Sequence, residues 1–231
     1  MIGRTKAFVK SAFPAGVRIY RRVRGLRSAR DSEPPGMEAV FSAIYLNNSW
    51  ADPESVSGRG STLARTEVIR RALPVLLASV RAESLLDAPC GDFNWMRHVD
   101  LGGVEYTGAD VVAELIARNR RRHGGKGRSF VELDITCDEL PRADVVLCRD
   151  CFIHLSFKSA RAAVANFKRS NSALLLATTH ANVRENTDTQ DGGFRPVNLR
   201  LPPFNFPQPE QLITEDPELG KCLGMWRLEE L

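Results

Sequence analysis

The sequence has little that would place the chain in a membrane or in an oxidising compartment. No apolar run reaches the roughly 18 residues that a membrane-spanning helix needs, and the amino terminus shows no apolar segment of the secretory type. The five cysteines are an odd number and lack the spacing of a disulfide framework. We therefore expect a cytoplasmic protein. A length of 231 residues, 43% of them hydrophobic, predicts one domain with a substantial core.

Two cysteines, Cys148 and Cys151, have the C-x-x-C spacing that also occurs in zinc and redox sites. A zinc site needs about four ligands, and no second cysteine pair or pair of histidines follows at a suitable spacing. Both cysteines lie at the end of an apolar run, where this small side chain packs well. We interpret them as core residues and predict no metal site from them.

Acidic residues are missing from the first 30 positions, which hold nine Lys and Arg. The rest of the chain has 23 basic and 28 acidic residues, a formal charge of −5. We predict a basic amino-terminal arm over residues 1–36, ending in a hinge at Pro34 and Pro35. Such an arm suits peripheral contact with an acidic membrane, or contact with RNA. A partly disordered leader, or a helix resting on the acidic body, is the alternative.

Apolar segments of strand and helix type alternate through the rest of the chain. This order predicts an α/β fold with a mostly parallel, seven-stranded sheet and right-handed crossovers. We expect strands at residues 84–88, 105–110, 129–134, 143–148, 172–178, 211–215 and 222–228. We expect helices near residues 37–47, 62–80 (interrupted at Pro74), 93–100, 111–122 and 158–170. Residues 37–82 would form a helical extension and a lid, 83–231 the core, and 181–211 a long loop.

Three of the expected strands end in an aspartate: Asp87, Asp110 and Asp134. In open α/β sheets, ligands bind at the carboxyl ends of the strands. A single aspartate there is more often a turn former or a cap, but three in register indicate a ligand site. Dinucleotide binding would require G-x-G-x-x-G. Only Gly91 of that pattern is present, and Asp92 would bring negative charge toward the phosphates.

With these strand ends, residues 83–180 resemble the class I S-adenosylmethionine-dependent methyltransferases, which have a Rossmann-like fold. Asp87 and Gly91 match the family's first motif, which lies against the methionine part of the cofactor. Asp110 matches the acid that binds the ribose, and Asp134 with the Ile135 backbone matches the position facing the adenine. The sequence departs from the family where Pro89 and Phe93 replace frequent glycines.

The loop before the second helix supplies further candidates for cofactor binding. Gly58 and Gly60 allow a close approach to Arg59, which would pair with the cofactor's carboxylate, although a plain helix-entry loop capped by Ser61 is the alternative. Trp50 or Trp95 would cover the apolar parts of the cofactor. The full expected set is Trp50, Arg59, Asp87, Ala88, Gly91, Trp95, Asp110, Val111, Asp134, Ile135 and Arg149.

Methyl transfer to a hydroxyl requires an in-line approach and removal of a proton. His154 comes four residues after Asp150, so one helical turn would place both on one face. We expect His154 to be the base, because an unperturbed imidazole pKa near 6.5 suits this role, with Asp150 fixing its tautomer. His180, just after the fifth strand, is the rival candidate. Alternatively, His154 packs against the sheet and Asp150 caps a turn.

The long loop interleaves amides and acids with aromatic residues, a pattern that suits a polyhydroxylated acceptor. The candidates are Asn182, Arg184, Asp188, Asp191, Phe194, Arg195, Asn198, Phe204 and Phe206. Asp188 and Asp191 offer oxygen ligands for Mg²⁺, on weak evidence. A nucleic-acid acceptor is disfavoured, because the Asp-Pro-Pro-aromatic pattern of base-methylating enzymes is missing after the fourth strand.

The resemblance and the pattern of the long loop together predict an O-methyltransferase that acts on a carbohydrate or glycolipid precursor. The loop pattern is similar to that of small bacterial enzymes of polysaccharide synthesis, including those of mycobacterial methylated mannose polysaccharides. An RNA or protein methyltransferase recruited by the basic arm is the alternative. A cofactor-binding protein without activity is a third possibility.

Overall fold

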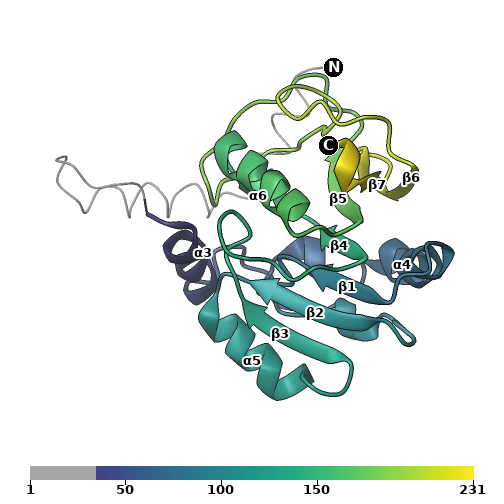
Figure 1. Cartoon of the computed structure of the whole chain (residues 1–231). Coiled ribbons are helices and arrows are strands. Elements are labelled where there is room, and N and C mark those ends of the chain that lie inside the picture. The colour runs from purple at the N-terminus through teal and green to yellow at the C-terminus, as the bar shows by residue number, and fades with distance from the viewer. Residues whose placement is uncertain (1–34) are drawn as a thin grey trace, which may run out of the picture.

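A seven-stranded sheet organises the computed structural model, which describes residues 35–231 (Figure 1). The strand order is β3-β2-β1-β4-β5-β7-β6. Neighbours among β1 to β5 run parallel, whereas β7 pairs antiparallel with both β5 and β6. The strands are β1 (Ser84–Asp87), β2 (Glu105–Asp110), β3 (Arg128–Glu132), β4 (Val145–Cys148), β5 (Leu174–His180), β6 (Gln211–Asp216) and β7 (Lys221–Arg227). The predicted basic arm lies outside the described residues, except for its last two positions.

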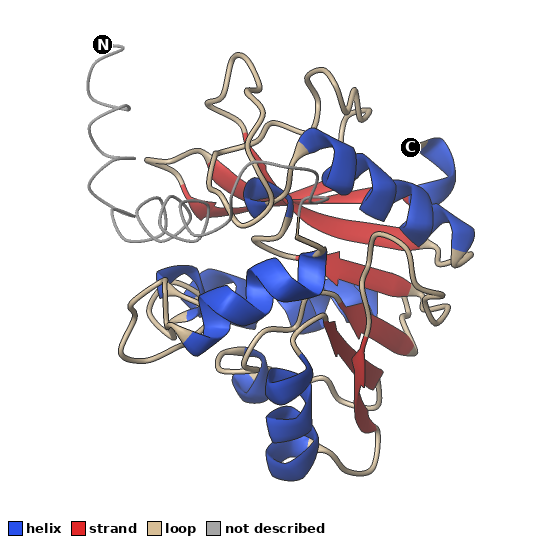
Figure 2. Ribbon diagram, turned by 90° about the vertical axis from the view of Figure 1, so that its left-hand side faces the viewer, coloured by secondary structure: helices blue, strands red, loops and turns tan. Residues whose placement is uncertain are grey.

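Four α-helices accompany the described strands. Figure 2 shows α3 crossing in front of the strands. The helices are α3 (Met37–Leu46), α4 (Glu67–Ser79), α5 (Ala113–His123) and α6 (Phe157–Arg169). None of the described helices is long and apolar enough to cross a membrane.

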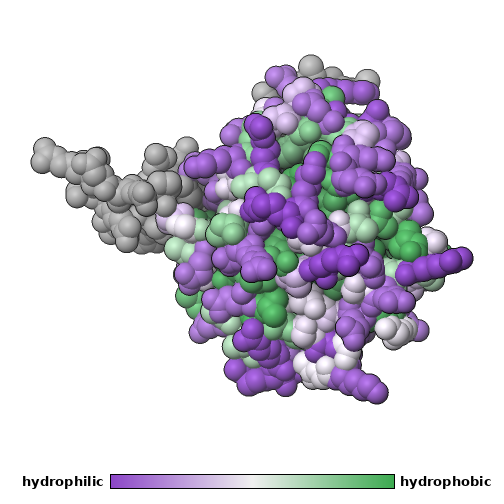
Figure 3. Space-filling view, viewed as in Figure 1, coloured by the Kyte–Doolittle hydropathy of each residue, from purple (hydrophilic) through white to green (hydrophobic). Residues whose placement is uncertain are grey.

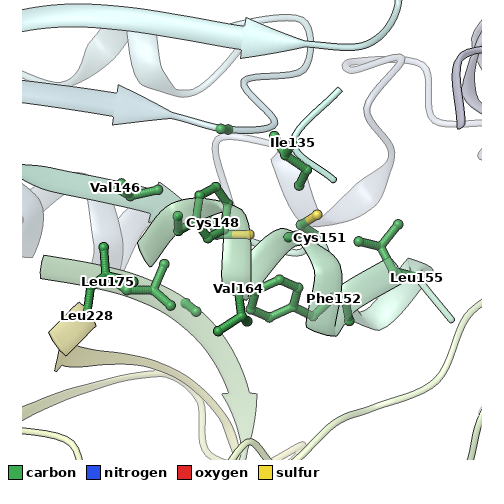
Figure 4. Packing of buried hydrophobic residues seen from close by; sticks show 14 of the residues in the cluster. Ile135, Val146, Cys148, Cys151, Phe152, Leu155, Val164, Leu175 and Leu228 are labelled. Carbon is green, nitrogen blue, oxygen red and sulfur yellow. The ribbon is translucent and has the colours of Figure 1, made fainter. Parts of the chain in front are cut away.

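Successive residues of the central strands enter two separate cores. Leu86 and Val146 pack with α6 residues, including Val164, on one face (Figure 4). Leu85 and Val145 pack with α4 residues on the other face. Because both faces are covered, these strands read as continuous apolar runs in the sequence.

The cysteines of the C-x-x-C spacing lie in the first of these cores. Cys148 is fully buried and Cys151 is 6% exposed. Both pack near Ile135 and Val164 (Figure 4). All five cysteines are free thiols. The interpretation of this pair as packing residues is confirmed.

Two local predictions about helices were wrong. The helix expected over residues 93–100 is only a 3₁₀ turn, Met96–His98, because Gly91 and Phe93 adopt left-handed conformations with φ of +55° and +60°. Pro74 lies inside α4 without ending it. The missing N–H costs one hydrogen bond, while burial of Ile69 and Leu73 stabilises the helix on both sides of the proline.

Candidate active site

A cavity of about 660 Å³ opens at the carboxyl ends of the parallel strands. This volume is within the range of about 300–1,000 Å³ that is typical of small-molecule sites. The predicted site residues that line it are Trp50, Arg59, Asp87, Gly91, Trp95, Asp110, Val111, Asp134, Ile135, Arg149, Asp150, His154 and His180. Ala88 is fully buried beneath the first loop and does not line the cavity.

Asp87, the last residue of β1, lines the cavity. Its side chain accepts a 2.6 Å hydrogen bond from the Tyr106 hydroxyl, and the residue is 3% exposed. Burial raises the pKa of this carboxyl to about 7, against the lowering effect of the Tyr106 hydrogen bond. The group is therefore poised to change its charge near neutral pH.

Asp110 joins the ends of β1 and β2. It accepts hydrogen bonds from the backbone amides of Gly91 at 3.0 Å and Val112 at 3.1 Å. Burial raises the pKa of Asp110 to about 6, although these amides favour the ionised form. The two amides occupy part of its accepting capacity, and a carboxylate has about four acceptor sites. Asp110 can therefore also accept hydrogen bonds from ligand hydroxyls in the cavity.

Asp134 lies two residues beyond the end of β3 rather than in the strand. Its carboxylate accepts from the amide and the hydroxyl of Thr136, at 2.8 and 2.6 Å, in a local turn. Asp134 therefore has the turn-forming role that a lone aspartate usually has, while still lining the cavity.

The loop before α4 is attached to the first strand loop through Asp92. The Asp92 carboxylate accepts from the Ser55 hydroxyl at 2.9 Å, the Val56 amide at 3.0 Å and the Ser57 hydroxyl at 3.2 Å. A Cβ on Gly91 would stand 2.3 Å from the Ser57 oxygen, so the glycine allows this close approach. The sequence indicated only that Asp92 is unfavourable to phosphates, and its role in holding the loop before α4 was missed.

Four charged side chains form an alternating network along one wall of the cavity. Arg149 binds Glu215 through two nitrogens, the shorter contact being 2.6 Å, and approaches Asp150 at 3.2 Å. Lys221 contacts Asp150 at 2.7 Å and Glu215 at 3.2 Å. Arg149 also lies over the Trp95 ring, 5.3 Å from its centroid. Because each charge is paired, all four can be largely buried.

Glu215 and Lys221 were missed by sequence reasoning because they come from the β6–β7 hairpin, 66 and 71 residues from their partners. A signal was present, since both are charged residues next to strand ends. Burial alone would raise the pKa of Asp150, but Arg149 and Lys221 outweigh it and hold the value well below the usual range. Asp150 is therefore a fixed anion, and it is unsuited to proton abstraction at neutral pH.

The expected pairing of Asp150 with His154 was wrong. His154 lies in a 3₁₀ turn, Phe152–His154, and its Nδ1 is 2.7 Å from the Gly193 carbonyl oxygen. A carbonyl only accepts, so this contact assigns the proton of the neutral ring to Nδ1 and the lone pair to Nε2. Burial lowers the pKa of His154, which keeps the imidazole uncharged at neutral pH.

Aromatic rings flank this imidazole. The Trp50 ring lies 5.1 Å from the His154 ring and Phe194 lies 5.7 Å away, measured between centroids. No protein partner is found for Nε2 among residues 35–231. His154 therefore lines the cavity with a free lone pair on Nε2, and Gly193, Trp50 and Phe194 fix the orientation of its ring.

His180 has the opposite hydrogen-bonding arrangement. It is 5% exposed, and its Nδ1 accepts from the Val197 amide at 3.4 Å. In the neutral ring this assigns the proton to Nε2, so that nitrogen has no lone pair to offer. Burial also lowers the pKa of His180. The arrangement favours His154 over His180 as a base.

The predicted acceptor loop contributes less to the cavity than expected. Asn182 and Phe194 line it, together with Val183 and Pro196. Asp191 and Asp188 instead accept from the backbone amides of Ser156 and Phe157 at the start of α6, at 2.7 and 2.8 Å. The other candidates, which do not line the cavity, are Arg184, Arg195, Asn198, Phe204 and Phe206.

The described part of the chain presents no cluster of ligands for a divalent cation. Among the described residues, no group of three or more His, Cys, Asp and Glu side chains is arranged to hold a metal ion. The oxygens of Asp188 and Asp191 that had suggested one are used in capping α6.

No protein-family model matches the sequence, and no curated protein matches it. Solved structures do match. The match to human N-acetylserotonin methyltransferase in complex with SAM covers 98% of this chain and 68% of that chain, with 12% identity and a TM-score of 0.61. The match to 1,6-didemethyltoxoflavin-N1-methyltransferase from Burkholderia thailandensis covers 86% of this chain and 92% of that chain, with 17% identity and a TM-score of 0.56.

A third similar structure is TehB from Haemophilus influenzae, with 13% identity and a TM-score of 0.51, where the chain covers 68% of its own length and 61% of TehB. The chain spans 66% of the methyltransferase domain of bacterial CtHen1, a likeness with a TM-score of 0.45. The identities are low, so these comparisons bear on the fold. The chain has the Rossmann-like fold of the first two structures, both of which are named as methyltransferases.

Proposed function

We propose that this protein is an S-adenosylmethionine-dependent O-methyltransferase whose acceptor is a hydroxyl of a carbohydrate or glycolipid precursor. The proposal depends most on His154, which lines the same cavity as Asp110 and whose neutral ring has its lone pair on Nε2. Two solved structures of similar fold support the cofactor: N-acetylserotonin methyltransferase was solved with S-adenosylmethionine, and 1,6-didemethyltoxoflavin-N1-methyltransferase with its demethylated product, S-adenosylhomocysteine.

The donor groups in the cavity fit this cofactor. Asp110 is available to ribose hydroxyls, and the Gly91 loop lies next to it. Val111 and Ile135 supply apolar walls for the adenine. Arg59, an exposed residue on the cavity wall, can pair with the cofactor's carboxylate. Bound S-adenosylmethionine supplies a methyl group activated by its sulfonium.

His154 then acts on the acceptor. Its Nε2 takes the proton of the attacking hydroxyl, while the Gly193 carbonyl holds the Nδ1 proton. The resulting imidazolium is stabilised by the negative charge of Asp150, which raises the pKa of His154 against the effect of burial. Asp150 therefore assists the base without taking the proton.

The acceptor side of the cavity combines polar and apolar groups. Asn182 and Lys221 are polar, and Phe194 and Trp50 offer ring faces beside His154. Such a combination suits a sugar, whose hydroxyls bind polar groups and whose ring hydrogens pack on aromatic faces.

The test combines cofactor binding with turnover. We expect calorimetric titration to show micromolar binding of S-adenosylmethionine, much weakened by Asp110→Ala. Transfer of labelled methyl groups to monosaccharides and alkyl glycosides should be lost in His154→Gln, with cofactor binding kept. His98→Gln, at an exposed histidine outside the cavity, is the matched control. Binding without methylation of any acceptor would indicate a non-catalytic protein. Full activity in His154→Gln would remove the assigned base.

A further inference from the structure

We propose that Asp150 and Lys221 together bind a second hydroxyl of the acceptor, adjacent to the one that is methylated, so that the site selects vicinal diols. This inference rests on the proposed function and names its substrate class more closely. It concerns the alternating charge network, whose four members line the same cavity as His154.

The pair has unused hydrogen-bonding capacity of both kinds. Lys221 contacts Asp150 and Glu215, so one of its three ammonium protons has no protein acceptor in the described chain. On Asp150, Oδ2 accepts from Lys221 and forms an ion pair with Arg149 at 3.2 Å, while Oδ1 accepts from the Thr178 hydroxyl at 3.2 Å. Oδ1 therefore keeps a free acceptor site. A hydroxyl both donates and accepts, and it can bind both groups at once.

The two side chains are accessible from the cavity without being open to bulk water. The exposed fraction of the side chain is 18% for Asp150 and 13% for Lys221, against 1% for Glu215. Lys221 begins β7 and is paired across the ladder with His180 of β5. Its side chain therefore emerges at the strand ends that line the cavity.

The pair is rigid. Asp150 has a left-handed backbone with φ of +52° and donates its amide to Thr178 at 2.8 Å. A Cβ on Gly60 would stand only 2.7 Å from its Oδ2, so the lid packs directly against this carboxylate. Glu215 holds Lys221 from the other side. A ligand hydroxyl would meet groups that are already oriented, which increases discrimination.

Both members of the pair line the same cavity as His154. Asp150 comes two residues after the end of β4, and His154 ends the 3₁₀ turn, Phe152–His154, that follows it. The Gly193 carbonyl and the Trp50 and Phe194 rings complete the surroundings of His154. A diol that presents one hydroxyl to Nε2 can therefore present its neighbour to the Asp150–Lys221 pair.

The preference for a diol over a mono-ol follows from the protein groups that an acceptor with only one hydroxyl leaves without hydrogen-bond partners. An acceptor with one hydroxyl would cover the pair with apolar surface, leaving a partly buried donor and acceptor without partners. Losing one hydrogen bond to a charged group lowers kcat/KM about 10- to 100-fold. The wild-type enzyme should therefore prefer a vicinal diol over the matching mono-ol by about this factor.

The experiment measures methyl transfer to cis- and trans-1,2-cyclohexanediol, 1,3-cyclohexanediol and cyclohexanol, using labelled S-adenosylmethionine. We expect one of the 1,2-diols to have the highest kcat/KM. Lys221→Met should reduce the ratio of diol to mono-ol kcat/KM toward one, and Lys221→Arg should keep part of the preference. Lys126→Met, at an exposed lysine outside the cavity, is the matched control. Cofactor titration of each variant verifies that it is folded.

The outcomes separate the two proposals. If all four compounds and all sugars are inert in the folded, cofactor-binding wild type, the proposed function fails. If they are methylated at equal kcat/KM, or Lys221→Met keeps the full diol preference, the function stands and the diol inference is overturned. If Lys221→Met does not fold, the wild-type comparison and Lys221→Arg still decide.

Discussion

Replacing Asp92 by alanine should release the lid from the first strand loop. Besides its three lid contacts, the carboxylate accepts from the Asn94 amide at 3.2 Å. The serine hydroxyls can turn to water when the carboxylate is removed. The Val56 amide, which donates to Asp92 at 3.0 Å in a partly buried position, loses its partner.

The magnitude follows from that amide. Leaving a buried donor unsatisfied costs about 1–3 kcal/mol, which corresponds to about a 5- to 150-fold change in an equilibrium constant at roughly 1.4 kcal/mol per tenfold. We expect local opening of residues 50–61 to become more frequent by this factor. The free energy of global unfolding should change less, because the central strands are stabilised by their packing against α4 and α6.

Hydrogen exchange of the Val56 amide is the direct assay, and the affinity for S-adenosylmethionine is the functional one. In Asp92→Ala, exchange at Val56 should accelerate about 5- to 150-fold, and affinity should weaken by no more than the same factor. Asp100→Ala is the control, since Asp100 accepts from the Gly102 amide in an exposed turn outside the cavity. Unchanged exchange at Val56 would refute the assigned role of Asp92.

Two further predictions concern the core around the site. Because burial raises the pKa of Asp87 from 3.8 to about 7, the folded state binds the extra proton between these values, and stability should fall as pH rises from about 4 to 7. Asp87→Asn should flatten that slope in urea titrations at pH 5 and pH 8, and equal slopes in both proteins would contradict the prediction. In Gly224→Ala, the new Cβ would lie 2.2 Å from the Trp226 ring. Overpacking should cost about 1–3 kcal/mol and lower Tm, unlike Gly103→Ala, where the space is open; an unchanged Tm would argue against this close packing.

The sequence predicted the sheet because buried parallel strands require continuous apolar runs. All seven strands lie within a few residues of their expected positions, and Asp87 and Asp110 come together because parallel strands end at one edge. The helix predicted after β1 failed for a local reason. Apolar periodicity did not reveal that Gly91 and Phe93 adopt left-handed conformations.

Long-range pairing was decided by the tertiary structure alone. The pattern before α6 suggested that Asp150 serves His154, but Lys221 and Arg149 bind Asp150, and the Gly193 carbonyl takes its place on the imidazole. Local spacing predicts which side chains share a turn. It does not reveal which distant charge or carbonyl will satisfy them. The choice between His154 and His180 depends on those distant partners. Lys221 reaches the site because β7 pairs antiparallel with β5, which places Lys221 opposite His180.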